Sequence, residues 1–317
     1  MFKWSKLILA SALALTLAAC GADQSGSPSE SSAATERSEN AIVITDVLGN
    51  EHVFETPPES VAALSYGEMD ILLKLGANVV GRPTISGTMT AEEEAIKEIG
   101  NPHEPSFEQI AVIHPDVLIV PPSFMQFASN IEAQGTKVIY SSANSVQEIK
   151  DSMEMFGELF QKQEEAAKLV EDIDTRIAAL EKAAEQTDTL LIYGAPGTYM
   201  VALDSSLSGD ILNLAGGKNV ASDFPATDLY PTYASLSVEK IVERNPKVVM
   251  VLTHSNPDAV VAGFNQQMNT SAAWKNLDAV KNDNIIILPA DLFGNNPGTK
   301  VIESIEFMVK TLNEVNK

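Results

Sequence analysis

The sequence predicts an α/β protein of two lobes, each with a central sheet of parallel type, joined by a long rigid interdomain helix. From residue 41 onward, short apolar runs alternate with segments of helical periodicity, which is the pattern of α/β folds. One helix-strand unit occurs twice. Between its two copies, residues 146–186 contain no proline and a single glycine, so they are predicted to be helical.

Composition limits the classes of function. The chain has 317 residues, which is room for about two domains. Its 44% hydrophobic and 20% charged residues are typical of a globular protein. The formal net charge of −22 argues against a nucleic-acid partner, since phosphate backbones attract basic surfaces. Cys20 is the only cysteine, so an intramolecular disulfide and a cysteine-based zinc finger are excluded.

Residues 1–19 are predicted to be a signal peptide. Lys3 and Lys6 precede an apolar run over residues 7–17, which is shorter than the ~20 residues that span a bilayer as a helix. The tetrad at residues 17–20, Leu-Ala-Ala-Cys, resembles the bacterial lipobox, in which the cysteine is acylated and becomes the new N-terminus.

Cys20 is therefore the predicted lipidation site, and an ordinary signal peptide with a chance cysteine is the alternative. The serine-rich residues that follow it, to residue 40, predict a flexible tether. Together these features predict an exported protein held at a membrane by lipid.

The first lobe is predicted to cover residues 41–145. Apolar runs at residues 42–44 and 53–54 flank Gly49-Asn50, which predicts a β-hairpin. Residues 61–64 predict a buried strand.

The repeated unit links this lobe to the second one. Residues 106–120 and residues 237–251 share Ser, Glu, Ile, Pro and a final Val at a constant offset of 131 residues. Each copy is predicted to be a short helix with a serine N-cap, stopped at a proline and followed by a buried parallel strand. We infer that the two lobes are built on one plan.

Residues 146–187 are predicted to connect the lobes as one long helix or as two closely joined ones. A helix of this length would form a stiff strut between the lobes. The second lobe is predicted to cover residues 188–317, beginning with a buried strand at residues 190–193. A cleft between two such lobes is the default site for a small molecule. The apolar positions at helical spacing in the connection include Met153, Phe156, Leu159, Phe160, Ala166, Leu169, Val170, Ile173, Ile177 and Leu180.

This organisation resembles the substrate-binding lipoproteins of ABC importers, the class that carries siderophores, cobalamin and heme on a class III periplasmic-binding-protein fold. Within that class the chain is most similar to the heme-receptor lipoproteins of the Gram-positive iron-regulated surface determinant systems. The similar stretches are residues 80–84, 99–105, 194–199, 209–210, 215–220, 253–254 and 293–294.

The resemblance implies a monomeric, lipid-anchored receptor on the extracellular face of the cell membrane. It would capture heme in the interlobe cleft by axial histidine ligation and deliver it to an ABC permease and its ATPase for iron acquisition. Upstream surface proteins that donate heme are further expected partners. The alternative is a ferric-siderophore-binding lipoprotein of an ABC importer, which would use several cationic or aromatic contacts and no axial ligand.

No enzyme motif is present. The sequence has no His-Glu-x-x-His and no Gly-x-Ser-x-Gly, and residues 194–197 lack the Gly-Lys-Ser/Thr end of a phosphate-binding loop. We therefore expect no enzymatic activity, and a lipid-anchored hydrolase without recognisable motifs is the weakest alternative.

Two of the four histidines are the predicted iron ligands. His103 lies in a proline-framed loop, and His254 follows a predicted strand at its carboxyl end, where open α/β sheets bind ligands. In the receptors that the chain resembles, the first of these positions is methionine and the second is histidine. The resemblance therefore implies heme as the bound group, with bis-histidine ligation. His52 is predicted to lie on the surface, and His114 to cap a helix.

Other candidates would surround the heme. The tyrosines that fall in predicted loops near strand ends can line a flat aromatic ligand, with local packing as the alternative. Arg82 is placed by resemblance near a heme propionate, with a solvated surface arginine as the alternative. The predicted binding set is Tyr66, Arg82, Thr84, Tyr199, Tyr233 and Phe293, with Tyr230 as a further tyrosine of this kind.

The resemblance also implies one acid on each lobe that docks on permease arginines, six residues before a glycine on the first helix of its lobe. Asp70 before Gly76 and Asp210 before Gly216 have this spacing, and Glu68 is a substitute in the first lobe. Plain solvated helix acids are the alternative.

Overall fold

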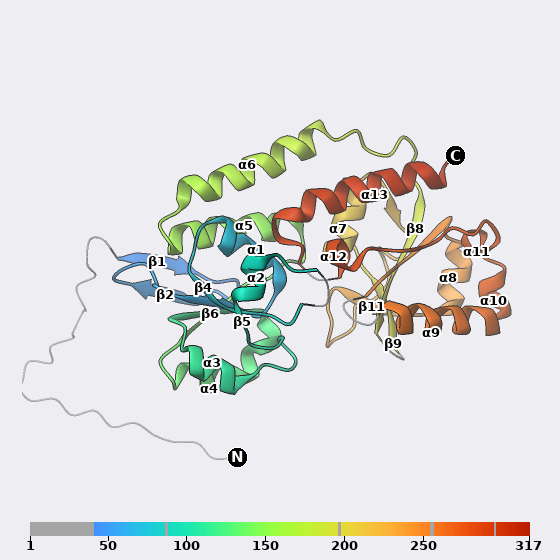
Figure 1. Ribbon diagram of the computed structural model, residues 1–317. Coiled ribbons are helices and arrows are strands. Elements are labelled where there is room, and N and C mark those ends of the chain that lie inside the picture. The colour runs from blue at the N-terminus through green and yellow to red at the C-terminus, as the bar shows by residue number, and fades with distance from the viewer. Residues whose placement is uncertain (1–40, 86–87, 196–197, 254–256, 295) are drawn as a thin grey trace, which may run out of the picture. The chain divides into compact units, whose positions relative to one another are not determined.

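The computed structural model describes residues 41–85, 88–195, 198–253, 257–294 and 296–317. The predicted signal peptide, Cys20 and the tether lie outside these ranges. The chain forms a two-stranded hairpin, two larger sheets and the helices that cover them (Figure 1). Two α/β units with a parallel first sheet confirm the predicted fold class.

The first sheet contains five parallel strands in the order β5-β4-β3-β6-β7. Helices connect these strands, as parallel pairing requires. The strands are β3 (Val61–Ala63), β4 (Val79–Arg82), β5 (Lys97–Glu98), β6 (Val117–Val120) and β7 (Lys137–Tyr140), and the helices are α1 (Tyr66–Lys74), α2 (Ala91–Ala95), α3 (Phe107–Ile113), η1 (Pro122–Phe124) and α4 (Met125–Glu132).

The predicted hairpin is confirmed. Strands β1 (Ile42–Thr45) and β2 (Glu51–Phe54) pair in antiparallel fashion, with Ile42 opposite Phe54. Gly49 in the connecting turn has a φ of 82°, which a residue with a side chain rarely adopts.

The second sheet has six strands and is mixed. Strand β8 pairs in parallel with β10 and β12, and β12 pairs in parallel with β13, whereas β9 runs antiparallel to both β8 and β11. The antiparallel part follows from chain length, because the connection between β8 and β9 is too short for a crossover. The strands are β8 (Asp188–Ala195), β9 (Thr198–Ala202), β10 (Lys218–Asn219), β11 (Tyr233–Ser235), β12 (Val248–Leu252) and β13 (Ile285–Ile287).

Helices of several lengths accompany the second sheet and end the chain. They are α7 (Leu207–Leu214), α8 (Val238–Arg244), α9 (Pro257–Thr270), α10 (Ala272–Lys275), α11 (Asp278–Lys281), α12 (Ala290–Phe293), η2 (Gly298–Lys300) and α13 (Val301–Val315).

The two copies of the internal repeat have the same hydrogen bonds at both ends of their helices. Ser106 caps α3 and Ser237 caps α8, each accepting a hydrogen bond from the backbone N–H three residues later. Each helix ends at a left-handed residue, with φ of 43° at His114 and 44° at Asn245. His114 is the C-cap residue of α3, as predicted, but its imidazole contacts the carbonyl oxygen of Gln134, beyond the end of α4, at 2.8 Å rather than a carbonyl of its own helix. Both copies then enter a fully buried strand, β6 or β12.

The connecting segment is a pair of helices, the second of the two alternatives that the sequence allowed. Helix α5 (Val146–Leu159) and helix α6 (Gln163–Ala179) are separated by a turn in which Gln161 has a φ of 53°. Contacts between Lys150 and Asp174, and between Gly157 and Ala166, show that the helices run antiparallel. The connection is therefore a pair of antiparallel helices, and the longer one, α6, leads into the second sheet.

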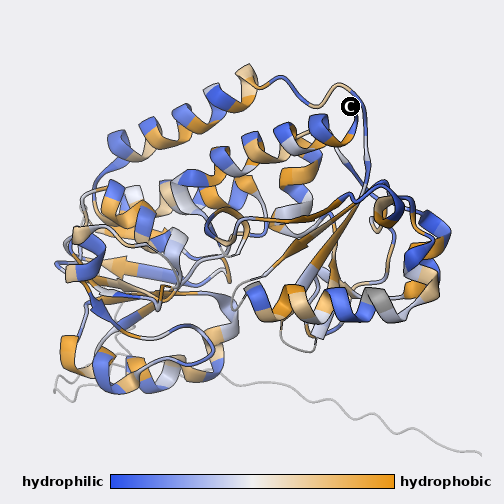
Figure 2. Ribbon diagram, turned by 45° about the vertical axis from the view of Figure 1, so that its right-hand side comes forward, coloured by the Kyte–Doolittle hydropathy of each residue, from blue (hydrophilic) through white to orange (hydrophobic). Residues whose placement is uncertain are grey.

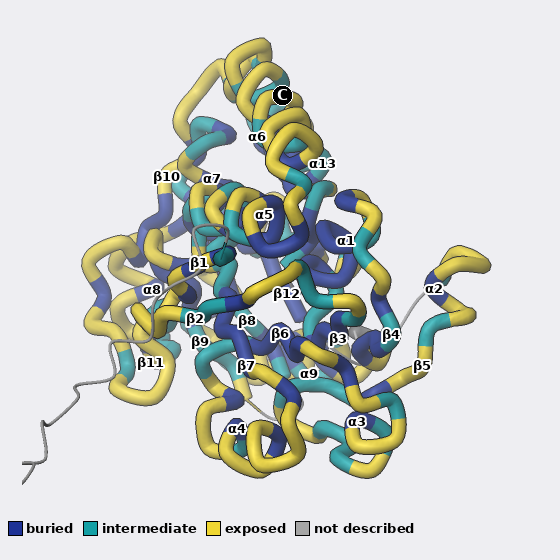
Figure 3. Tube along the Cα trace, turned by 90° about the vertical axis from the view of Figure 1, so that its left-hand side faces the viewer, coloured by how far each residue is buried: buried dark blue, intermediate teal, exposed yellow. Residues whose placement is uncertain are grey.

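The long strands of the second sheet are mostly hydrophobic (Figure 2), and β3, β6 and β12 are buried throughout (Figure 3). One continuous apolar cluster includes side chains of both sheets and of helices α1, α5, α7 and α13. Smaller clusters fill the opposite face of each sheet. The helices shared by the two sheets therefore belong to one core, and α6 joins it through Ala166 and Ile173 although most of its surface is exposed.

Candidate functional site

His103 is exposed at the tip of a tight loop between β5 and α3. The Asn101 side chain fixes this loop, because its Oδ1 accepts hydrogen bonds from the backbone N–H groups of His103 and Glu104, both at 3.0 Å. Gly100 and Pro105 form a β-bridge at the base of the loop. The backbone is thus held while the imidazole faces solvent, which leaves it available to a ligand.

His254 lies outside the described residues. The strand that leads to it is β12, whose five residues are all buried, and Thr253 beyond the strand is also buried. Gly294, just after α12, packs closely on this strand end: a Cβ there would lie 3.0 Å from the Thr253 carbonyl oxygen. The position of the second predicted ligand is therefore known only from its neighbours in the chain.

Arg82 and Thr84 converge on one carboxylate. The Glu98 side chain accepts a hydrogen bond from the Arg82 guanidinium at 3.1 Å and one from the Thr84 hydroxyl at 2.8 Å. Arg82 is 8% exposed and also donates to the Pro83 carbonyl oxygen. Its Nε has no hydrogen-bond partner among the described residues. The guanidinium is thus already paired at the edge of the first sheet, so a propionate would have to compete with Glu98.

Tyr66 begins α1, directly after the carboxyl end of β3. Its hydroxyl accepts a hydrogen bond from the Lys300 ammonium at 2.9 Å, and the same ammonium lies 5.1 Å from the centroid of the ring. Burial raises the pKa of the Tyr66 phenol above its usual range, although the Lys300 hydrogen bond opposes that shift. No sequence motif indicated Lys300, because only the fold brings it beside a residue that is 234 positions away.

The structure separates two of the predicted tyrosines. The Tyr233 ring packs at a tilt of 50° against Tyr193, with 5.4 Å between centroids, on the face of the second sheet that joins the continuous core. Tyr199 lies on the opposite face, where its hydroxyl donates to the Val260 carbonyl oxygen and its ring packs against Phe264. These two predicted residues do not line a common surface.

Burial has a strong effect on the Tyr233 phenol. Desolvation, with a smaller effect from Tyr193, raises its pKa to about 12. The group therefore stays a protonated hydrogen-bond donor at neutral pH. Tyr230, in the preceding loop, is 52% exposed.

Phe293 is a core residue. It is 4% exposed, and its ring packs edge-on against Phe307 of α13, with 5.8 Å between centroids. The structure therefore places it inside the protein rather than on a surface that a ligand can reach.

The three predicted docking acids have partners within the protein. Asp70 is 7% exposed and accepts hydrogen bonds from Thr299, and the half-buried Asp210 accepts one from the backbone N–H of Val146. Glu68 is 3% exposed and contacts the Ser141 hydroxyl. The predicted helices and glycines are found, since Gly76 and Gly216 follow α1 and α7 with φ of 73° and 91°.

The reasoning from the sequence missed a polar cluster in the first hairpin. The Asp46 carboxylate accepts hydrogen bonds from the backbone N–H groups of Leu48 and Asn50, the Asn50 amide and the His52 imidazole, all at 2.9 to 3.0 Å. His52, predicted to lie on the surface, has a side chain that is only 14% exposed. An aspartate opening a turn that ends in Gly-Asn was the signal available for this cluster.

Within the described ranges, no three His, Cys, Asp or Glu side chains gather closely enough to hold a metal ion. In the same ranges no helix has the length and apolar character required to cross a membrane.

The family of the chain follows from comparison with known proteins. The model of the periplasmic binding protein family matches residues 61–292. The chain belongs to the periplasmic binding protein family. The high-affinity heme uptake system protein IsdE of Staphylococcus aureus is 29% identical over 229 residues, which is 70% of this chain and 76% of that protein.

Solved structures show the same fold. The S. aureus IsdE complexed with heme superposes with a TM-score of 0.72 at 24% identity, covering 80% of this chain and 98% of that one. An ABC transporter substrate-binding protein from Listeria monocytogenes gives 0.70 at 27%, covering 82% and 100%. The petrobactin-binding protein YclQ from Bacillus subtilis gives 0.69 at 23%, covering 87% and 98%.

Membership of this family assigns the general role. The protein is a substrate-binding component of an ABC importer and not an enzyme, and its partner in transport is a permease. Both expectations from the sequence are thereby confirmed.

Proposed function

We propose that this family member is a heme receptor. It is anchored through acylated Cys20 to the extracellular face of the cell membrane, where it captures heme and passes it to the permease of an ABC importer for iron acquisition. The observation that carries the proposal is the 29% identity, over 76% of its length, to a protein named for high-affinity heme uptake.

The exposed histidine loop supports the choice of ligand. Imidazole nitrogen is a common ligand of heme iron. His103 presents an exposed side chain on a backbone that Asn101 fixes, so little loop ordering would oppose ligation. In the proposal, His254 supplies the second axial ligand from the carboxyl end of β12.

The two histidines set the expected chemistry of the cargo iron. Met/His ligation raises the reduction potential of a heme, so a pair of histidines favours the ferric state by comparison. A ligating imidazole must also be neutral, so proton binding competes with iron and acid weakens the complex.

Aromatic and polar residues would hold the rest of the ligand. Tyr66 and Tyr233 remain candidates, because each is a half-buried residue beside the continuous core. Arg82 and Thr84 contribute only if a propionate displaces Glu98 from them.

A hemin titration of the purified protein tests the proposal. The protein should turn red-brown with a sharp absorption band near 400 nm, in a low-spin, six-coordinate spectrum. Either His103→Ala or His254→Ala should convert it to a mixed or high-spin spectrum, with His254 the costlier loss. Glu104→Ala changes an exposed neighbour in the same loop and serves as the matched control. Unchanged spectra in both histidine variants would remove these residues from the site and favour a ferric siderophore as cargo.

A further inference from the structure

Asp70 and Asp210 occupy equivalent positions beside the two sheets. Each lies six residues before a glycine of positive φ, on the helix that follows an early strand of its sheet. Helices α1 and α7 also end alike, because the N–H groups of Gly76 and Gly216 each donate to the carbonyl oxygen three residues earlier. The two aspartates therefore occupy corresponding positions on two similar helices.

Each carboxylate reaches the start of a helix that follows the other sheet. Asp210, beside the second sheet, accepts a hydrogen bond at 2.8 Å from the backbone N–H of Val146, the first residue of α5 after the first sheet. Asp70, beside the first sheet, accepts hydrogen bonds from the N–H (2.8 Å) and hydroxyl (2.6 Å) of Thr299, just before α13, which follows the second sheet. Each sheet is thus followed by a helix whose start is bound by a carboxylate from beside the other sheet.

The chemistry of these contacts favours strong bonds. An ionised carboxylate that accepts from unpaired N–H groups at a helix start makes charge-assisted hydrogen bonds. Thr299 offers two donors to the same Asp70 oxygen. Both contacts border the apolar cluster that α1, α5, α7 and α13 share, so water has little access to Asp70.

The contact between Asp70 and Thr299 requires a glycine at position 298. It has a φ of 61°, and a Cβ at this position would lie 2.7 Å from the Asp70 carboxylate and 2.8 Å from the Gly67 carbonyl oxygen. A side chain there would push the Thr299 N–H away from Asp70. The Tyr66–Lys300 hydrogen bond links the same two elements, α1 and η2.

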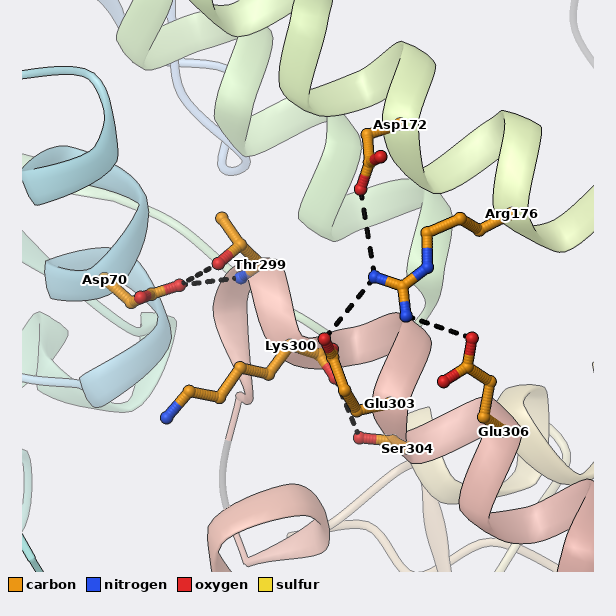
Figure 4. A network of polar contacts seen from close by, with 8 residues as sticks. All are labelled: Asp70, Asp172, Arg176, Thr299, Lys300, Glu303, Ser304 and Glu306. Carbon is orange, nitrogen blue, oxygen red and sulfur yellow. Dashed lines mark hydrogen bonds and ion pairs between the residues drawn. The ribbon is translucent and has the colours of Figure 1, made fainter.

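Ion pairs with α6 hold α13 at points farther along the helix. Figure 4 shows Asp70 bound to Thr299 at one end and the Arg176 guanidinium of α6 at the other. Arg176 pairs with Glu306 at 3.0 Å and Glu303 at 3.4 Å, so α13 is held from two sides.

We propose that Asp70 and Asp210 are a reciprocal pair of latches that fixes how the two sheets are oriented toward each other. They are positioning residues. Each carboxylate holds the start of a helix from the opposite half of the chain, so a change in the orientation of the sheets must break both contacts. This role differs from the permease docking that their spacing predicted.

Amide hydrogen exchange in the full-length protein tests the latches at the bonds themselves. In Asp70→Ala the Thr299 amide, and in Asp210→Ala the Val146 amide, should exchange roughly tenfold to a hundredfold faster. Asn variants keep one oxygen acceptor and should fall between alanine and wild type. Gly298→Ala should reproduce the Asp70→Ala result at Thr299. Glu154→Ala, an exposed acid on α5, is the matched control and should change neither amide.

Three other results would overturn the proposal. Unchanged exchange at both amides in the alanine variants, with loss only of uptake, would assign the aspartates to permease docking. Equal acceleration of the core amides of β6 and β12 would mean that the carboxylates support the whole fold rather than an orientation. Acceleration of the Thr299 and Val146 amides in Glu154→Ala equal to that in the aspartate variants would show that it does not arise from the loss of these two carboxylate contacts.

Discussion

Replacement of Asp46 by alanine should destabilise the protein strongly, although Asp46 lies in a surface hairpin. Its side chain is fully buried, and it accepts four hydrogen bonds of 2.9 to 3.0 Å within that hairpin. A weaker contact of 3.4 Å reaches the N–H of Tyr140 on β7. The hairpin is therefore tied to the first sheet through this carboxylate.

The loss of unfolding free energy in Asp46→Ala depends on which hydrogen-bond donors the change leaves without a partner. Leu48 and Asn50 are exposed, so water can replace the carboxylate there at little cost. The Tyr140 N–H is buried, and a buried donor without a partner costs about 1–3 kcal/mol. Loss of the charged bond to His52 adds about 1.5–3 kcal/mol. Allowing for non-additivity, we expect the free energy of unfolding to fall by about 3 kcal/mol.

The same carboxylate should make stability depend on pH. Desolvation acts to raise the pKa of Asp46, but hydrogen bonds from His52 and Asn50 outweigh it, so the folded-state pKa lies below 3.8. The stabilisation is thus fully present above that unfolded value and is lost as the pH falls through the folded pKa. Asp46→Asn cannot titrate and should lack this step.

Urea denaturation, followed by circular dichroism at about pH 7 and about pH 2.5, measures both effects. Exposed Glu55 in the same region provides the control Glu55→Ala, which should change stability by less than about 0.5 kcal/mol. An Asp46→Ala variant as stable as that control would refute the reasoning.

Three further predictions concern other parts of the chain. Gly157→Val should lower the melting temperature in a thermal scan, since a Cβ there would lie 2.5 Å from the Ala166 Cβ and separate α5 from α6; an unchanged melting temperature contradicts the tight packing. Cys20→Ala should release the protein into the medium or leave it unprocessed, as cell fractionation would show, and normal processing with membrane retention contradicts acylation. Tyr233→Phe should remove a phenol that ionises at about pH 12 from an ultraviolet pH titration, and a loss near the usual pH 10 would contradict its burial.

Local patterns were sufficient to predict much of the fold. The Gly49-Asn50 turn, the serine caps and the buried strands of the repeat depend on neighbours within a few residues, and all are found. The break between α5 and α6 was not determined by sequence, because Gln161 gives no signal for a left-handed turn.

The candidate site was less accessible to sequence reasoning. Tyr199 and Tyr233 were predicted to lie in loops but belong to β9 and β11. The faces they occupy depend on the antiparallel register of these strands, which the alternation of elements does not reveal. The spacing of Asp70 correctly predicted its helix and its glycine. Its partner, Thr299, is 229 residues away and comes into contact only when the chain has folded.

The place of α13 in the core has a consequence for when folding can finish. Ile305, Met308 and Leu312 are fully buried in the same cluster as α1 and α5, so the first half of the protein cannot complete its core until the last helix is available. During N-to-C synthesis the chain therefore stays incompletely folded until its final residues have emerged. A truncation that removed α13 would leave the core of the first half open as well as that of the second.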